Sequence, residues 1–133
     1  MVIVDTTVWI DYFGGNSTPQ VEWLEKEMTR QRLGITDIIL CEVLQGVRDD
    51  GQFDKVRDAL LCYEVFSMGG VDLALAAAQN YRALRAQGIT VRKTIDCMIA
   101  TFCLQNNHTL LHNDRDFESF EIVFGLQVIH NIV

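Results

Sequence analysis

Acidic residues directly follow two apolar runs that have the length of short buried strands. Asp5 comes after Val2–Val4, and Asp114 and Asp116 come shortly after Thr109–His112. In an open parallel α/β sheet, ligands bind just beyond the carboxyl ends of the strands. If the two strands are parallel neighbours, these carboxylates emerge at the same edge of the sheet. We therefore expect chemistry at this edge.

Further acids lie in stretches that have helical periodicity. Asp96 stands in the first turn of a helix that we expect Thr94 to cap, where the helix dipole favours an anion. Glu42 lies in an apolar helical stretch, where burial of a carboxylate is costly unless something pairs with it. The four aspartates, each taken alone, also have an ordinary structural interpretation as turn, loop or helix-start residues, whereas Glu42 is the acid least easily explained in this way.

A cluster of carboxylates without balancing bases would be an unfavourable arrangement. Two unit charges about 4 Å apart repel by roughly 4 kcal/mol at an effective dielectric constant of 20. A divalent cation removes this repulsion, and an all-oxygen ligand set suits Mg²⁺ or Mn²⁺ rather than zinc. The spacing alone therefore supports a metal-site hypothesis beside the structural interpretation.

The elements that would position these acids alternate along the chain. Apolar runs predict strands at 2–4, 32–36, 63–66, 109–112 and 126–129. The spacing of apolar residues predicts helices at 8–13, about 19–30, 37–47, 53–61, 73–88, 94–103 and 114–124. We therefore expect a single domain over residues 1–133, an α/β fold with three α/β/α layers and a central parallel sheet of about four to five strands.

The composition limits the class of protein. Nearly half of the residues are hydrophobic, which allows a sizeable core. The sequence has no basic leader segment and no long apolar run, which predicts a cytoplasmic protein without a membrane segment. The four cysteines form no C-x-x-C pair and lie in apolar patterns, so we expect buried free thiols.

The net charge of −7 is unusual for a nucleic-acid binder, which normally has a basic surface. Three interpretations of the acidic residues remain open. They form a solvated surface, a cluster that holds cations, or a surface that binds a basic partner.

Four stretches carry a resemblance that covers nearly the whole chain. They are VDTTVWIDYF at 4–13, CEVLQG at 41–46, TIDCMIA at 94–100 and LLHNDRDF at 110–117. Together, and in this order, they resemble the PIN-domain ribonucleases, in particular the VapC toxins of prokaryotic toxin–antitoxin pairs. The resemblance implies the PIN fold, Mg²⁺- or Mn²⁺-dependent endoribonuclease activity with one or two ions, and inhibition by a VapB-type antitoxin. It also implies a homodimer, or a hetero-oligomer with the antitoxin.

The resemblance also implies roles for individual residues. The family's catalytic and metal-binding acids fall on Asp5, Glu42, Asp96 and Asp114. Asp116 matches an additional metal-binding acid, and Thr7 matches a hydroxyl that would orient Asp5. In the implied mechanism, a water activated by the metal attacks the scissile phosphate.

One residue departs from the family's pattern. A small hydroxyl residue usually stands two positions before the fourth acid, where this chain has His112. His112 would then contact RNA phosphate or serve the structure alone. Arg92, Lys93 and Arg115 lie near the site in sequence and would contact the RNA backbone, or else belong to a solvated surface.

Other functions remain as alternatives. The first is a non-catalytic PIN-like module that binds RNA or a protein, which would lack Mg²⁺-dependent turnover. The second is a phosphatase of the haloacid-dehalogenase type, which needs a second Asp where this chain has Thr7.

Overall fold

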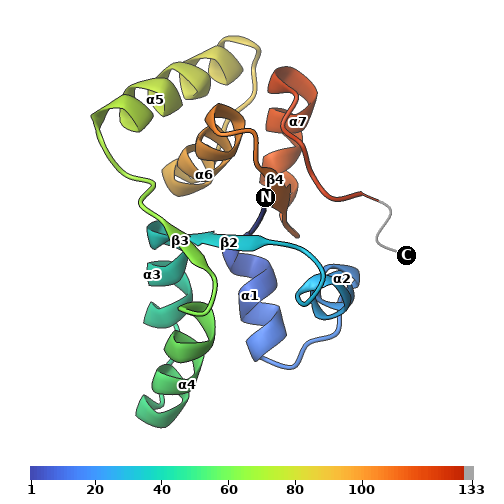
Figure 1. Cartoon of the computed structure of the whole chain (residues 1–133). Coiled ribbons are helices and arrows are strands. Elements are labelled where there is room, and N and C mark those ends of the chain that lie inside the picture. Colours follow the sequence, from blue (N-terminus) through green and yellow to red (C-terminus); the bar gives the residue numbers. More distant parts are fainter. Residues whose placement is uncertain (131–133) are drawn as a thin grey trace.

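The computed structural model describes residues 1–130, which form a sheet covered by helices on both faces (Figure 1). Its strands are β1 (Val2–Val4), β2 (Leu33–Thr36), β3 (Glu64–Phe66) and β4 (Thr109–Leu111). They lie in the order β3-β2-β1-β4, and all neighbours are parallel. The predicted parallel sheet is confirmed. The predicted end of the domain, at residues 131–133, lies outside the described residues.

Helices α1 to α4 cover one face of the sheet, and α5 to α7 cover the other (Figure 1). Their bounds are α1 Thr6–Phe13, α2 Pro19–Glu27, α3 Asp37–Gln45, α4 Asp50–Leu60, α5 Val71–Ala86, α6 Thr94–Gln105 and α7 Glu118–Phe124, with a 3₁₀ turn η1 at Arg115–Phe117. This arrangement confirms the three-layer α/β/α prediction. All residues of β1 and β2 are buried, as expected for central strands covered on both faces.

The predicted strand at 126–129 is wrong. Only an isolated parallel bridge joins Val128 to Leu110, so the sheet of the described residues has four strands. Gly125 ends α7 in the left-handed conformation at φ 73°, and the chain then makes only two backbone hydrogen bonds to Leu110. These bonds are too few to form a ladder.

Two other local predictions are also wrong. Thr94 does not cap α6 but is its first helical residue, because Lys93 has the extended conformation of the capping position. All four cysteines are free, but Cys41 and Cys62 are exposed while Cys97 and Cys103 are buried. The apolar pattern around Cys41 misled the prediction, because α3 buries only one stripe of its surface.

None of the helices within residues 1–130 combines the length and the apolar character that crossing a membrane requires.

Candidate active site

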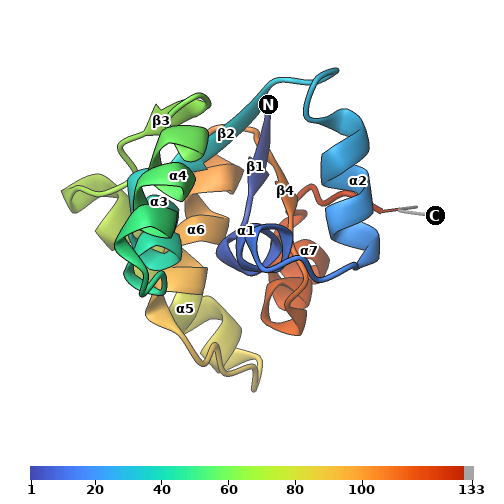
Figure 2. The same ribbon diagram turned by 90° about the horizontal axis from the view of Figure 1, so that it is seen from below.

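The candidate site lies at the carboxyl ends of β1 and β4. Figure 2 shows β1 between β2 and β4, and the register pairs Val4 with Leu111. The backbone N–H of Asp5 donates to the carbonyl oxygen of Leu111 at 2.9 Å, so Asp5 and the segment before Asp114 leave the sheet together. From β1 the strand order proceeds to β2 and β3 on one side and to β4 on the other. The strand order therefore changes direction at β1. Open α/β sheets form their binding crevice at such a topological switch point.

Asp5 is buried and is fixed by its neighbours. Its side chain is only 2% exposed and caps the N-terminus of α1. Oδ2 accepts hydrogen bonds from the hydroxyl of Thr7 at 2.9 Å and from the Thr7 backbone N–H at 3.4 Å. Burial raises the pKa of Asp5 to about 6, and the charge of Glu42 adds to this, although the Thr7 hydrogen bonds oppose it. Metal-free Asp5 is therefore a weaker acid than a solvated aspartate.

Glu42 comes to the site from α3, which follows β2 and packs against α1. It is half-buried, and its Oε1 accepts a hydrogen bond of 2.6 Å from the hydroxyl of Thr6. No role for Thr6 was predicted from the sequence. The available signal was the pair of hydroxyl residues after Asp5, because consecutive residues at a helix start point in different directions.

Asp96 has a carboxylate oxygen whose hydrogen-bonding capacity is not satisfied within the described residues. It lies in the first turn of α6 and is 7% exposed, and its Oδ2 is buried with no hydrogen-bond partner among residues 1–130. The pKa of Asp96 is raised to about 7, and burial is the largest cause. The charges of Asp5, Asp114 and Glu42 contribute to this rise, while Lys93 opposes it. A buried oxygen without a partner is destabilising unless a ligand satisfies it.

Asp114 and Asp116 complete the cluster. Asp114 caps η1, and its Oδ1 accepts a hydrogen bond of 2.9 Å from the backbone N–H of Asp116. Asp96, Asp114 and Asp116 each place one carboxylate oxygen so that all lie within 4.8 Å of one another. Asp116 is also bound by Arg92, whose Nε and Nη2 lie 3.2 and 3.1 Å from its oxygens. The sequence did not predict this ion pair.

A family model described as "PIN domain" matches residues 2–123, which is most of the chain.

The chain belongs to the PIN-domain family.

This PIN domain is similar to curated and solved relatives over almost its whole length. It is 29% identical over 130 residues to the protein named VapC ribonuclease Mb1587 of Mycobacterium bovis and to Ribonuclease VapC11 of Mycobacterium tuberculosis, with 96% of each chain covered. The structure of VapBC2 from Rickettsia felis bound to a promoter DNA fragment has a TM-score of 0.76 at 18% identity, covering 97% of this chain and 98% of the other. A toxin–antitoxin complex from Klebsiella pneumoniae has a TM-score of 0.72 at 20% identity, covering 98% and 97%.

His112 supports the backbone of the PIN domain's acidic cluster. Its Nδ1 accepts the backbone N–H of Asp114 at 3.2 Å, and its ring packs on Phe117 with centroids 4.9 Å apart. Burial lowers the pKa of His112, which favours the neutral form of the ring. The other basic residues that the sequence singled out, Arg92, Lys93 and Arg115, are exposed around the cluster.

The five acids fit a divalent cation by their chemistry. The donor set consists of carboxylate oxygens, which hard cations prefer. Three of them are within reach of one ion, and the unpartnered Oδ2 of Asp96 is an open ligand position. Asp5 and Glu42 are close enough for their charges to raise the pKa of Asp96.

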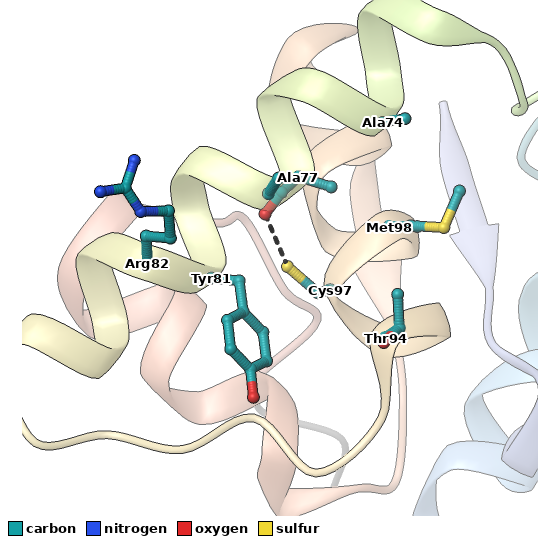
Figure 3. A pocket seen from close by; sticks show the side chains of 8 residues that line it. Ala74, Ala77, Tyr81, Arg82, Thr94, Cys97 and Met98 are labelled. Carbon is teal, nitrogen blue, oxygen red and sulfur yellow. Dashed lines mark hydrogen bonds between the residues drawn. The ribbon is translucent and has the colours of Figure 1, made fainter.

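A pocket between α5 and α6 has no acidic residue in its lining (Figure 3). Its volume is about 320 Å³, and its lining includes Ala77, Cys97 and Met98. The Cys97 thiol donates to the carbonyl oxygen of Ala77 at 3.2 Å, and burial raises its pKa. Cys97 is therefore a protonated packing residue rather than a nucleophile.

Proposed function

We propose that this PIN domain is a Mg²⁺-dependent endoribonuclease toxin of the VapC type. The observation that carries the proposal is the buried Oδ2 of Asp96, which lies near four other carboxylates and has no hydrogen-bond partner in the described part of the chain. The similarity to proteins named VapC ribonucleases supports RNA as the substrate. Five acids without a cation would repel one another. A protein that only bound a partner would have no need to keep such a cluster of acids.

In this proposal the catalytic and metal-binding acids are Asp5, Glu42, Asp96 and Asp114, with Asp116 as a further ligand. They hold one or two Mg²⁺ ions, for which Mn²⁺ would substitute. When bound, such an ion lowers the pKa of a coordinated water molecule and neutralises charge on the scissile phosphate.

The remaining residues orient the acids and hold the RNA. Thr7 holds the carboxylate of Asp5, and Thr6 holds that of Glu42. Arg92, Lys93 and Arg115 contact the RNA backbone, where each neutralised phosphate adds to the affinity. The expected products have 5′-phosphate and 3′-hydroxyl ends.

We also propose a VapB-type antitoxin as the partner, in a hetero-oligomer with this chain or with its homodimer. Support comes from the similar folds of chains in VapBC and toxin–antitoxin complexes. The net charge of −7 favours a basic partner segment. An arginine of that segment would pair with the acids and exclude RNA. Because its proposed substrate is cellular RNA, we propose that the protein acts in the cytoplasm.

The test is cleavage of total cellular RNA by purified protein with Mg²⁺, with Mn²⁺ and with chelator. Asp5→Asn is the inactive variant, and Asp72→Asn, on the exposed start of α5, is the matched control. Metal-dependent cleavage by wild type and Asp72→Asn, lost in Asp5→Asn, is the expected result. Absence of cleavage by antitoxin-free protein under all conditions would favour the non-catalytic binding module instead.

A further inference from the structure

An open polar pocket lies beside the acidic cluster. Its volume is about 390 Å³, within the range of small-ligand sites. Three segments distant in sequence form it: Gln20 from the first turn of α2, Arg92 from the loop before α6, and residues between His112 and Glu118. Asp114 lines this pocket and also belongs to the acidic cluster. A ligand in the pocket is therefore next to the proposed metal site.

The lining of this pocket combines two guanidinium groups with carboxylates and neutral hydrogen-bonding groups. Arg92 and Arg115 are exposed guanidinium groups, while Asp114 and Glu118 carry the opposite charge. The two guanidinium groups can bind phosphate, while the carboxylates can accept hydrogen bonds from a neutral base. A nucleotide combines a phosphate with a base whose edge donates and accepts hydrogen bonds.

His112 presents a donor of defined position. Because Nδ1 accepts the N–H of Asp114, the neutral ring carries its proton on Nε2. The packing of the ring on Phe117 holds this donor in place.

Gln20 presents an amide that needs a partner. Its Oε1 is buried and has no hydrogen-bond partner among the described residues. A buried acceptor left without a donor is destabilising. The Gln20 side chain lines the pocket, and a rotation of its amide that exposes Oε1 would let it both donate to and accept from the edge of a nucleobase.

We infer that this pocket binds the base of an unpaired nucleotide next to the scissile phosphate, and that Gln20 and His112 are specificity-determining residues. The inference rests on the proposed ribonuclease function, because the nucleotide belongs to the RNA substrate.

The first experiment needs no cleavage. Metal-free protein is titrated with AMP, CMP, GMP and UMP, and the side-chain ¹⁵N signals of Gln20 and His112 are followed by NMR. At least one nucleotide should shift both signals, and Gln20→Ala should weaken its binding about tenfold. Gln20→Glu, which replaces the amide donor with a charge, should weaken it as well. Gln79→Ala, on the exposed face of α5, should leave binding unchanged.

The second experiment measures base preference on a library of randomised oligoribonucleotides. Gln20→Ala should reduce the preference at one position near the cut by five- to tenfold, with an unchanged Mg²⁺ requirement. An unchanged preference, without nucleotide-induced shifts, overturns the pocket inference and leaves the ribonuclease standing. Nucleotide binding in a protein that never cuts RNA overturns the proposed function and leaves the pocket standing. Shifts caused by a short arginine-rich peptide instead of nucleotides would assign the pocket to a protein partner and overturn the inference.

Discussion

The hydroxyl of Thr6 donates a hydrogen bond of 2.6 Å to Oε1 of Glu42, which lies 36 residues further along the chain. The next residue, Thr7, donates in the same way to Asp5 at 2.9 Å. Two adjacent hydroxyls at the start of α1 thus hold two carboxylates that follow different strands. The precision of the candidate site depends on this short segment.

We predict that Thr6→Val lowers the rate of RNA cleavage by about tenfold while the fold is retained. Valine keeps the shape of threonine but cannot hold Glu42, and loss of a residue that orients a metal ligand typically costs 10- to 100-fold. Steady-state kinetics with Mg²⁺ titration is the measurement. Thr6→Ser, which keeps the hydroxyl, is the control, and a wild-type rate in Thr6→Val would refute an orienting role.

We predict that Asp96→Asn stabilises the metal-free protein at pH 8 although it abolishes cleavage. The substitution removes a buried charge whose pKa is raised to about 7. The gain in the free energy of unfolding should be on the order of 1–3 kcal/mol. Urea unfolding in chelator measures it, with Asp72→Asn as the control. A loss of stability would show that the ionised carboxylate has a compensating partner.

The stability of the metal-free protein should fall as the pH rises from about 4 to about 7. Asp5 and Asp96 have pKa values raised from 3.8 to about 6 and about 7, so the folded chain holds protons that the unfolded chain releases. Stability decreases wherever the folded state binds more protons, and it levels off above the higher folded pKa. Chemical unfolding across this range is the measurement. The decline should be smaller in Asp96→Asn, and a rise in stability in this pH range would contradict the raised pKa values.

Mg²⁺ should raise the melting temperature of the wild-type protein by several degrees. A ligand at 100 times its Kd stabilises the folded state by about 2.7 kcal/mol. Differential scanning fluorimetry with Mg²⁺, Mn²⁺ and chelator tests this. Asp96→Asn should lose most of the shift, whereas Asp72→Asn should keep it. An equal shift in both variants would place the binding of the ion elsewhere.

We predict that Arg92→Ala raises the KM for RNA several-fold with little change in kcat or melting temperature. The Arg92 side chain is 74% exposed, so its ion pair with Asp116 contributes little to stability. In the proposed function this guanidinium binds a phosphate of the RNA. Kinetics on a defined RNA is the measurement, with Arg57→Ala on the far helix α4 as the control. A fall in kcat at constant KM would assign Arg92 to the orientation of Asp116 instead.

The sequence alone determined which segments become strands and helices and which acids follow them. Residues 2–4 predict a buried strand because burial on both faces demands continuous apolar residues. Asp5 marks the end of this strand because a charged side chain interrupts the apolar run. The quoted stretches around Asp5, Glu42, Asp96 and Asp114 also predicted the family. Weak local signals failed, as at Thr94 and at 126–129, because the positions of caps and short edge pairings depend on a few hydrogen bonds.

The tertiary structure decided which groups meet. Periodicity describes one element at a time, whereas the pairing of β1 with β4 and the packing of α1 on α3 join distant segments. The hydrogen bond from Thr6 to Glu42, the ion pair of Arg92 with Asp116 and the position of Gln20 beside His112 all depend on that packing. Burial is likewise a property of the whole fold, which is why only the folded chain raises the pKa of Asp96 and leaves its Oδ2 without a partner.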